Sequence, residues 1–226
     1  MSRRLLNRHI RPRPLDDQEI ARYLRVYDAR ALYQHPEAFP PLCSPALFGN
    51  DAPLELEVGC GTAEFLCSLA ASEREVNFVG VDIARRPLYK AIGYAAPLAL
   101  TNLRLLQADF AQLYPLLAPH SLRRVYVHFP DPHARPKFQR RRVVTPAFLS
   151  AIHRTLVPGG SLSVMTDHAA LFQEMLAVVE ADCRFQKTHD ERYLTGFEPA
   201  LKSRFQRIWE RHGLPILRLE VRTRQA

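Results

Sequence analysis

The stretch FPDPHARPKFQRRR, residues 129–142, places one acid and several cations where they could act on the same ligand. Asp131 stands between two prolines, whose rings restrict the backbone and present its carboxylate in a fixed direction. Five cations follow it: Arg135, Lys137, Arg140, Arg141 and Arg142. A fixed carboxylate can stabilise developing positive charge, and such cations can bind nucleic-acid phosphates. A rigid Asp-Pro turn followed by a solvated basic loop is the structural alternative.

A second chemical group begins at LELEVGCGTAEF, residues 54–65. Glu57, Gly59 and Gly61 end an apolar run there, and glycines let the backbone turn tightly and approach a ligand closely. A dinucleotide fingerprint would have a third small residue where this chain has Glu64, which would crowd a pyrophosphate. The pattern therefore favours a ligand without phosphate, although a glycine-containing turn with no ligand remains the alternative.

Two later apolar runs also end in acids, Asp82 and Asp109. A carboxylate accepts two hydrogen bonds, so Asp82 suits a pair of ribose hydroxyls, and Asp109 can accept from an adenine amino group. Together with the glycine turn, these acids indicate a site for a nucleoside.

All these residues lie at the ends of strands that alternate with helices. The expected strands are residues 54–59, 76–82, 103–109, 123–129, 161–167 and 215–223. The expected helices lie near residues 63–72, 84–98, 110–117, 145–156, 168–181 and 199–212. This alternation predicts a Rossmann-like α/β fold, with a mostly parallel, doubly wound sheet of about seven strands and helices on both faces. Ligands bind such sheets outside the carboxyl ends of the strands.

The N-terminal part differs in character from the rest. Residues 1–14 are arginine-rich and predict a basic arm, and residues 15–33 have helical spacing and begin with acids. We therefore expect a basic arm and helical lead-in over residues 1–52 and the main domain over residues 53–226.

Charge and composition narrow the class of protein. The net charge is +8 and three separate zones are basic, which favours nucleic acid over membrane as the partner. A generally basic proteome is the plain alternative. No apolar run approaches the roughly 18 residues of a membrane-spanning helix, and the N-terminus has no signal-peptide pattern. Four cysteines without metal spacing indicate reduced thiols, so we expect a cytoplasmic protein that needs no metal.

Several motifs together carry a resemblance to a known family. EVGCGTAEF, GVD and QADF look like the S-adenosylmethionine site of class I methyltransferases. With FPDP, RRR, PGGSLSVMTD and TGFE added, residues 54–221 resemble the bacterial tRNA (guanine-N7)-methyltransferase family. The resemblance implies methyl transfer from S-adenosylmethionine to N7 of a guanosine in the variable loop of tRNA.

The resemblance also implies roles for individual residues. Asp131 would be catalytic and would touch the cofactor. The other cofactor-binding residues would be Glu57, Gly59, Gly61, Asp82 and Asp109. The guanosine would be held by Arg135, Asp167, Thr195 and Glu198, and the RNA by Lys137, Arg140, Arg141 and Arg142. This chain departs from the family at His133, Arg135 and Phe138, where tryptophan, lysine and histidine are usual.

Local sequence leaves other interpretations open. Asp167 could simply cap the following helix, and Thr195 with Glu198 forms a T-x-x-E capping-box pattern. His128 and Trp209 are interpreted as packing residues. Two other functions remain: a class I methyltransferase for another RNA base or a small molecule, and a non-catalytic RNA-binding relative. The protein is expected to be a monomer or a homodimer.

Overall fold

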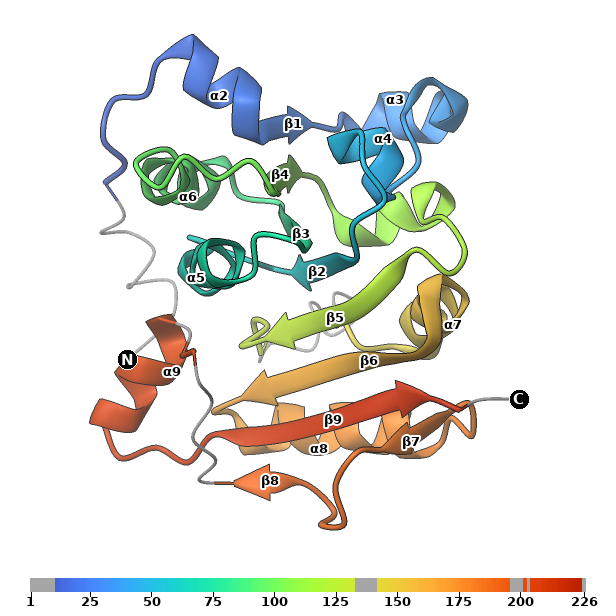
Figure 1. Cartoon of the computed structure of the whole chain (residues 1–226). Helices are drawn as coiled ribbons and strands as arrows, with labels where there is room; N and C mark the ends of the chain where they lie inside the picture. The colour runs from blue at the N-terminus through green and yellow to red at the C-terminus, as the bar shows by residue number, and fades with distance from the viewer. Residues whose placement is uncertain (1–10, 133–141, 196–200, 203, 225–226) are drawn as a thin grey trace. The chain divides into compact units, whose positions relative to one another are not determined.

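The computed structural model describes residues 11–132, 142–195, 201–202 and 204–224. They belong to two compact units, Met1–Ala118 and Pro119–Ala226 (Figure 1). Each unit has strands that pair among themselves, and each is described here by itself.

Unit 1 is built on a parallel sheet. Its strands are β1 (Leu24–Val26), β2 (Leu54–Val58), β3 (Asn77–Asp82) and β4 (Leu103–Gln107). They are arranged in the order β1-β4-β3-β2, and every pair is parallel. All residues of β2 are buried, as expected of a parallel strand that is covered on both faces. The carboxyl ends of β2, β3 and β4 therefore share one edge of this sheet.

Helices surround the sheet of unit 1. They are α2 (Asp17–Tyr23), α3 (Ala29–Gln34), η1 (Pro36–Ala38), α4 (Ser44–Phe48), α5 (Glu64–Ser72), α6 (Arg85–Ala95) and η2 (Phe110–Leu116). A capping box between Asp16 and Glu19 starts α2. Helices α5 and α6 contact each other and pack on β3 and β4 respectively (Figure 1). The loops that lead into them leave the carboxyl ends of β2 and β3.

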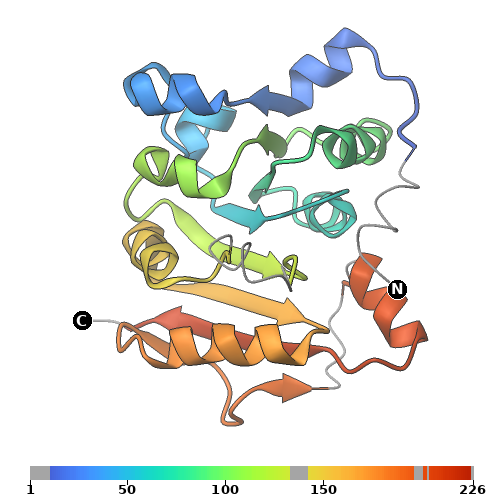
Figure 2. The ribbon, with the colours of Figure 1, turned by 180° about the vertical axis from the view of Figure 1, so that it is seen from behind.

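Unit 2 has a mixed sheet. Its strands are β5 (Leu122–His128), β6 (Leu156–Thr166), β7 (Phe185–Lys187), β8 (Leu194–Thr195) and β9 (Leu217–Thr223). The order is β5-β6-β9-β7, with β8 also on β9; β5 and β6 are parallel, whereas β9 is antiparallel to β6, β7 and β8. The helices are α7 (Pro146–Thr155), α8 (Ala169–Glu180) and α9 (Arg204–Arg211). Helix α8 covers β6 and β9, as Figure 2 shows from behind.

The predicted class I methyltransferase architecture is confirmed, and its six expected strands and most helices are present. The described residues form nine strands rather than about seven, because β1, β7 and β8 are too short for a periodic signal. The prediction of a single helix over residues 15–33 is wrong, because this segment forms α2, then β1, then α3. Residues 24–26 instead pair with β4, where Leu24 lies beside Leu105. The helix expected near residues 110–117 is a 3-10 helix, Phe110–Leu116, and it contains Pro115.

Two further properties bear on the sequence predictions. In the part of the chain that the structure describes, no helix is long and apolar enough to cross a membrane. The four cysteines are all free thiols; Cys60 and Cys67 are buried and Cys183 is exposed. The division into a lead-in and a main domain at residue 52 stays a prediction.

Candidate active site

The glycine turn after β2 is anchored to the end of β3. The backbone N–H groups of Gly59 and Cys60 both donate to the carbonyl of Val81, at 2.8 and 3.0 Å. Gly59 and Gly61 have φ of +75° and +55°, in the left-handed region that favours glycine. A Cβ at either glycine would meet nothing within 4 Å. The turn thus requires glycine for its backbone conformation, and it borders open space that a ligand can fill.

Asp82 ties this turn to the start of α6. Its Oδ2 accepts the N–H of Gly61 at 2.9 Å, and its Oδ1 accepts the N–H of Ala84 at 2.7 Å. Burial raises the pKa of Asp82, while these backbone hydrogen bonds oppose that rise. The N–H of Ile83 is a third backbone donor to this carboxylate, which still has acceptor capacity for a ligand hydroxyl. The structure therefore brings the predicted residues Gly61 and Asp82 together.

Glu57 lies near the end of β2 and is only 4% exposed. Its Oε2 has no hydrogen-bond partner among the described residues. Burial, and then the nearby charge of Asp82, raise the pKa of Glu57 to about 8. A buried polar atom without a partner is costly, and such atoms are commonly explained by function. A ligand that donates a hydrogen bond or carries positive charge would satisfy this carboxyl group.

Asp109 stands beyond β4, whose Gln107 pairs with Asp82 of β3. The backbone N–H of Ala108 donates to the carbonyl of Asp82 at 3.1 Å, which holds the two strand ends together. Asp109 is exposed, and its Oδ1 accepts the N–H of Ala111 as the N-cap of η2. This acid therefore has a structural role in addition to the predicted one, with its other oxygen available to a ligand.

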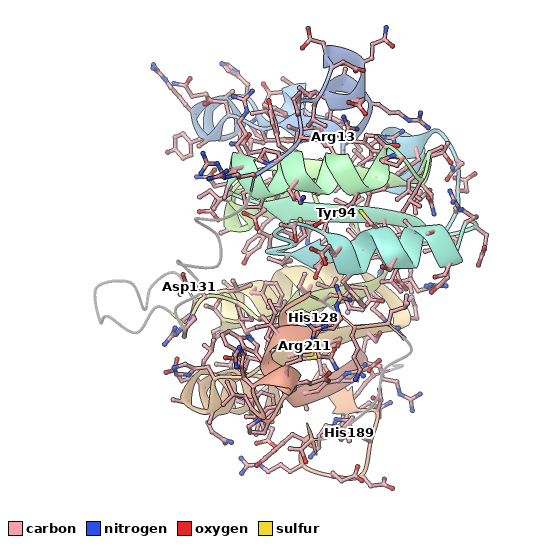
Figure 3. The ribbon with its side chains drawn as sticks, turned by 90° about the vertical axis from the view of Figure 1, so that its left-hand side faces the viewer. Arg13, Tyr94, His128, Asp131, His189 and Arg211 are labelled. Atoms are coloured by element: carbon pink, nitrogen blue, oxygen red, sulfur yellow. The ribbon has the colours of Figure 1, made fainter. Side chains whose placement is uncertain are left out.

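In unit 2, the chain turns sharply after β5. Phe129 has a φ of +52°, which is rare for a bulky residue, and it precedes a proline, which further restricts it. Its N–H donates to the carbonyl of Met165 at 2.7 Å, and its ring is buried. Such strain costs about 1–3 kcal/mol and concentrates at functional sites. Asp131 follows this turn and is exposed (Figure 3).

Asp167 follows β6, the strand that pairs with β5 through His128 and Met165. The N-cap of α8 is not Asp167 but His168, whose Nδ1 accepts the N–H of Leu171 at 3.1 Å. The plain helix-cap interpretation of Asp167 is therefore wrong. Because β5 and β6 are parallel, Asp131 and Asp167 follow the same edge of this sheet.

Thr195 is the second residue of β8 and pairs with Leu217 of β9. The next helix in the described residues, α9, begins at Arg204, and the capping-box interpretation of TGFE stays a prediction because residues 196–200 lie outside the described residues. The partner in that pattern, Glu198, lies outside the described residues, so the relation between the two side chains stays a prediction.

Comparisons with known proteins identify this chain as similar to methyltransferases. Residues 51–219 match the family model described as "Putative methyltransferase". A tRNA (guanine-N(7)-)-methyltransferase of Rubrobacter xylanophilus is 49% identical over 98% of this chain and 99% of its own. The chain belongs to the bacterial tRNA (guanine-N7)-methyltransferase family.

Other relatives agree with this membership. A tRNA (guanine-N(7)-)-methyltransferase of Chloroherpeton thalassium is 36% identical over 90% of both chains. The crystal structure of the 16S rRNA methyltransferase KamB is 18% identical, has a TM-score of 0.57 and covers 95% of this chain and 97% of its own. At that identity the likeness concerns the fold alone, which is that of the class I methyltransferases.

The residues at the edge of the unit 1 sheet fit the methyl donor of this class of enzyme, S-adenosylmethionine. The donor carries ribose hydroxyls, an adenine amino group and net positive charge but no phosphate. The chain offers acceptors for each: Asp82 and Asp109 at two strand ends, and Glu57 with its unpartnered oxygen. Gly59 and Gly61 lie at the same edge, beside open space.

The predicted RNA-binding cations are only partly described. Arg142 forms an ion pair with Glu174 of α8, with Nε 2.9 Å from Oε2, and its side chain is 15% exposed. The positive charge of Arg142 is thus already paired with the carboxylate of Glu174 in the same chain. The sequence did not indicate this ion pair. Arg135, Lys137, Arg140 and Arg141 lie outside the described residues, as do the departures at His133 and Phe138.

Two residues interpreted as packing are buried. His128 lies with Nε2 3.1 Å from Oγ of Ser163, and Trp209 is buried on α9. Burial lowers the pKa of His128 to about 3, with help from the charges of Arg218 and Arg124. This histidine therefore stays neutral near physiological pH.

The sequence analysis did not predict two local features, the left-handed backbone of Phe129 and the helix cap by His168. The only sequence signal for the first was the motif FPDP directly after a strand.

Proposed function

We propose that this protein transfers a methyl group from S-adenosylmethionine to N7 of a guanosine in tRNA. The observation that carries the proposal is the similarity to a named tRNA (guanine-N(7)-)-methyltransferase along nearly the whole of both chains. The acids and glycines at the carboxyl ends of β2, β3 and β4 support it, since they suit the cofactor. The target within tRNA is proposed to be the variable loop, and the location of the protein to be the cytoplasm.

Residues of unit 1 would hold the cofactor. Asp82 would accept hydrogen bonds from the ribose hydroxyls, and Asp109 would accept one from the adenine amino group. Glu57 would accept a hydrogen bond from a cationic group of the cofactor. Gly59 and Gly61 would let the backbone come close. The bound cofactor supplies an electrophilic methyl group on a sulfonium.

The chemistry makes modest demands on the protein. Guanine N7 has its own lone pair and loses no proton on methylation, so no strong general base is needed. The protein must align N7 with the methyl carbon and stabilise the positive charge that moves onto the purine. Asp131 would do both by accepting hydrogen bonds from N1–H and the amino group of guanine, as the catalytic residue. Asp167, Thr195, Arg135 and Glu198 would hold the guanosine in place.

The basic run would bind the RNA backbone. Lys137, Arg140, Arg141 and Arg142 would contact phosphates beside the target nucleotide. For Arg142 this requires that the phosphate compete with Glu174 or share the guanidinium with it, since a guanidinium has five N–H donors. The state of assembly is proposed to be a monomer or a homodimer.

The test is a methylation assay with unmodified tRNA, in which the products are identified by nucleoside mass spectrometry. We expect 7-methylguanosine. A different methylated nucleoside would favour the alternative of another RNA methyltransferase. Failure to bind S-adenosylmethionine in titration calorimetry would favour the alternative of a non-catalytic RNA-binding relative.

The variant Asp131→Asn tests the assigned catalytic residue. It keeps the shape of the side chain but removes its charge, so turnover should fall by a factor of roughly 100 or more. Asp190→Asn, which removes an exposed acid elsewhere in unit 2, is the matched control and should keep wild-type turnover. Equal turnover in the two variants would show that Asp131 is wrongly assigned.

A further inference from the structure

Helix α6 begins in a way that local helix energetics disfavour. Arg85 and Arg86 occupy its first turn, and the N-cap Ala84 has no side chain that can cap it. The N-terminus of a helix carries partial positive charge, so a cation there costs about 0.3–1 kcal/mol where an acid would stabilise. The nearest acid, Asp82, bonds the N–H of Ala84, and burial raises its pKa. Violations of this kind without a structural gain are expected at functional sites.

The rest of the outer face of α6 also carries cations, beside tyrosine rings. The opposite face packs into the core through Leu88, Ala91, Ile92 and Ala95. On the outer face, the guanidinium of Arg85 lies 4.9 Å from the ring centroid of Tyr89, and its Nε donates to the Tyr89 hydroxyl. Lys90 lies 5.0 Å from the ring centroid of Tyr94. The helix has three cations, two tyrosines and no acid on this face.

The charges on this face are not neutralised by the described part of the chain. Among the described residues, Arg85, Arg86 and Lys90 have no ion-pair partner. The neighbouring cation Arg13 is different: it reaches over α6 at Gly93, and its guanidinium is paired with Glu19. Figure 3 labels Arg13 and Tyr94 in this region. The described part of the chain thus leaves three cations without an ion pair, two of which, Arg85 and Lys90, lie over aromatic rings.

We propose that this face, Arg85, Arg86, Tyr89, Lys90 and Tyr94, binds the phosphate backbone of the RNA substrate. The inference rests on the proposed function. Cations interleaved with aromatic rings are what RNA backbones and unpaired bases bind. Arg86 and Lys90 are four residues apart, about 6 Å along the helix axis, which is comparable with the separation of neighbouring phosphates in a strand. Because α6 starts just after Asp82, RNA held here would pass beside the cofactor-binding edge of unit 1.

The test compares two double variants with the same loss of charge. Arg85→Gln with Arg86→Gln removes the first-turn cations, and Arg30→Gln with Arg74→Gln removes exposed cations elsewhere in unit 1. The affinity for tRNA is measured across a series of salt concentrations. Each lost phosphate contact should lower the slope of log K against log salt by about 0.7–0.9, so the first variant should lose about 1.4–1.8 and the control nothing.

Two further measurements separate binding from damage. The melting temperature of the Arg85/Arg86 variant should change little, since removing cations from a helix N-terminus is favourable whereas losing the Arg85–Tyr89 contact is not. Its KM for tRNA should rise several-fold. S-adenosylmethionine titration on the same proteins reports on the neighbouring Asp82 loop, and lost cofactor affinity that accounts for the whole change would overturn the proposal.

Other outcomes would refute RNA binding by this face of α6. If both double variants change the salt slope equally, or neither does, the proposed face is wrong. If the Arg85/Arg86 variant binds tRNA normally but the wild-type protein binds phosphatidylserine vesicles through these cations, the partner of the face is a membrane and the proposal is overturned. A wild-type protein that methylates tRNA beside an unaffected variant refutes only this inference. A wild-type protein that neither binds nor methylates tRNA refutes the proposed function as well.

Discussion

Replacing Glu57 by glutamine should change the pH dependence of both folding and cofactor binding. The pKa of Glu57 is about 8 in the fold against an ordinary value of 4.5, because the side chain is buried and Asp82 lies near. The folded protein therefore retains a proton that the unfolded chain releases. Each pH unit between the two values costs the folded state about 1.4 kcal/mol, so the cost at pH 7 is about 3 kcal/mol.

The sign of this effect follows from the direction of the shift. A raised pKa of an acid means that stability is greatest below the unfolded value and declines as the pH rises toward about 8, after which it is constant. Glu57→Gln has no proton to release at this position, so its stability should lack this decline. The amide adds an offset that does not vary with pH, and Asp82 titrates in both proteins. The difference in slope therefore reports Glu57 together with its coupling to Asp82.

The assay is urea unfolding followed by far-ultraviolet circular dichroism from pH 5 to pH 9, with Glu75→Gln as an exposed control. The free energy of unfolding of the wild-type protein should fall relative to Glu57→Gln between pH 5 and 8, whereas the control should run parallel to the wild type. Identical pH profiles in the wild type and Glu57→Gln would refute the raised pKa.

The ionisation of Glu57 should also affect the binding of the cofactor. A cationic ligand favours the charged carboxylate, so binding of S-adenosylmethionine near pH 7 should release a proton from Glu57. Wild-type affinity should then rise by up to about tenfold per pH unit below pH 8. Calorimetry in two buffers of different ionisation enthalpy counts the proton. Proton release that persists in Glu57→Gln would assign it to another group.

Two other predictions concern local structure. Gly59→Ala should lower the free energy of unfolding by about 1–2 kcal/mol through its φ of +75° even though its Cβ would meet no atom, and chemical denaturation measures this; an unchanged stability would mean that the turn relaxes. His168→Ala should cost about 1 kcal/mol through loss of the α8 cap, whereas Asp167→Asn leaves this cap in place and should raise KM for tRNA; a KM for tRNA that rises only in His168→Ala would contradict both assignments.

The strand ends show how far sequence reasoning reached. Glu57, Asp82 and Asp109 each lie at or near the end of a short β run, and the alternation of such runs with helical segments predicts a parallel sheet. Their common edge followed from that topology. The segment around Tyr27 shows the limit: its helical spacing was real, but pairing of residues 24–26 with β4 depends on a strand about 80 residues away.

The alternation of helices and strands along this chain determined by itself an α/β fold with a mostly parallel sheet, whereas the family came from the resemblance of its motifs, such as EVGCGTAEF and FPDP, to a known one. The alternation could do so because apolar periodicity and turn residues act over short distances. Only the tertiary structure decided which residue caps α8, that Phe129 takes a left-handed backbone, and that Arg142 faces Glu174. It also decided the pKa of Glu57, because the depth of burial and the nearness of Asp82 come from the pairing of β2 with β3. Charge and strain depend on neighbours that are distant in sequence, and these exist only in the folded chain.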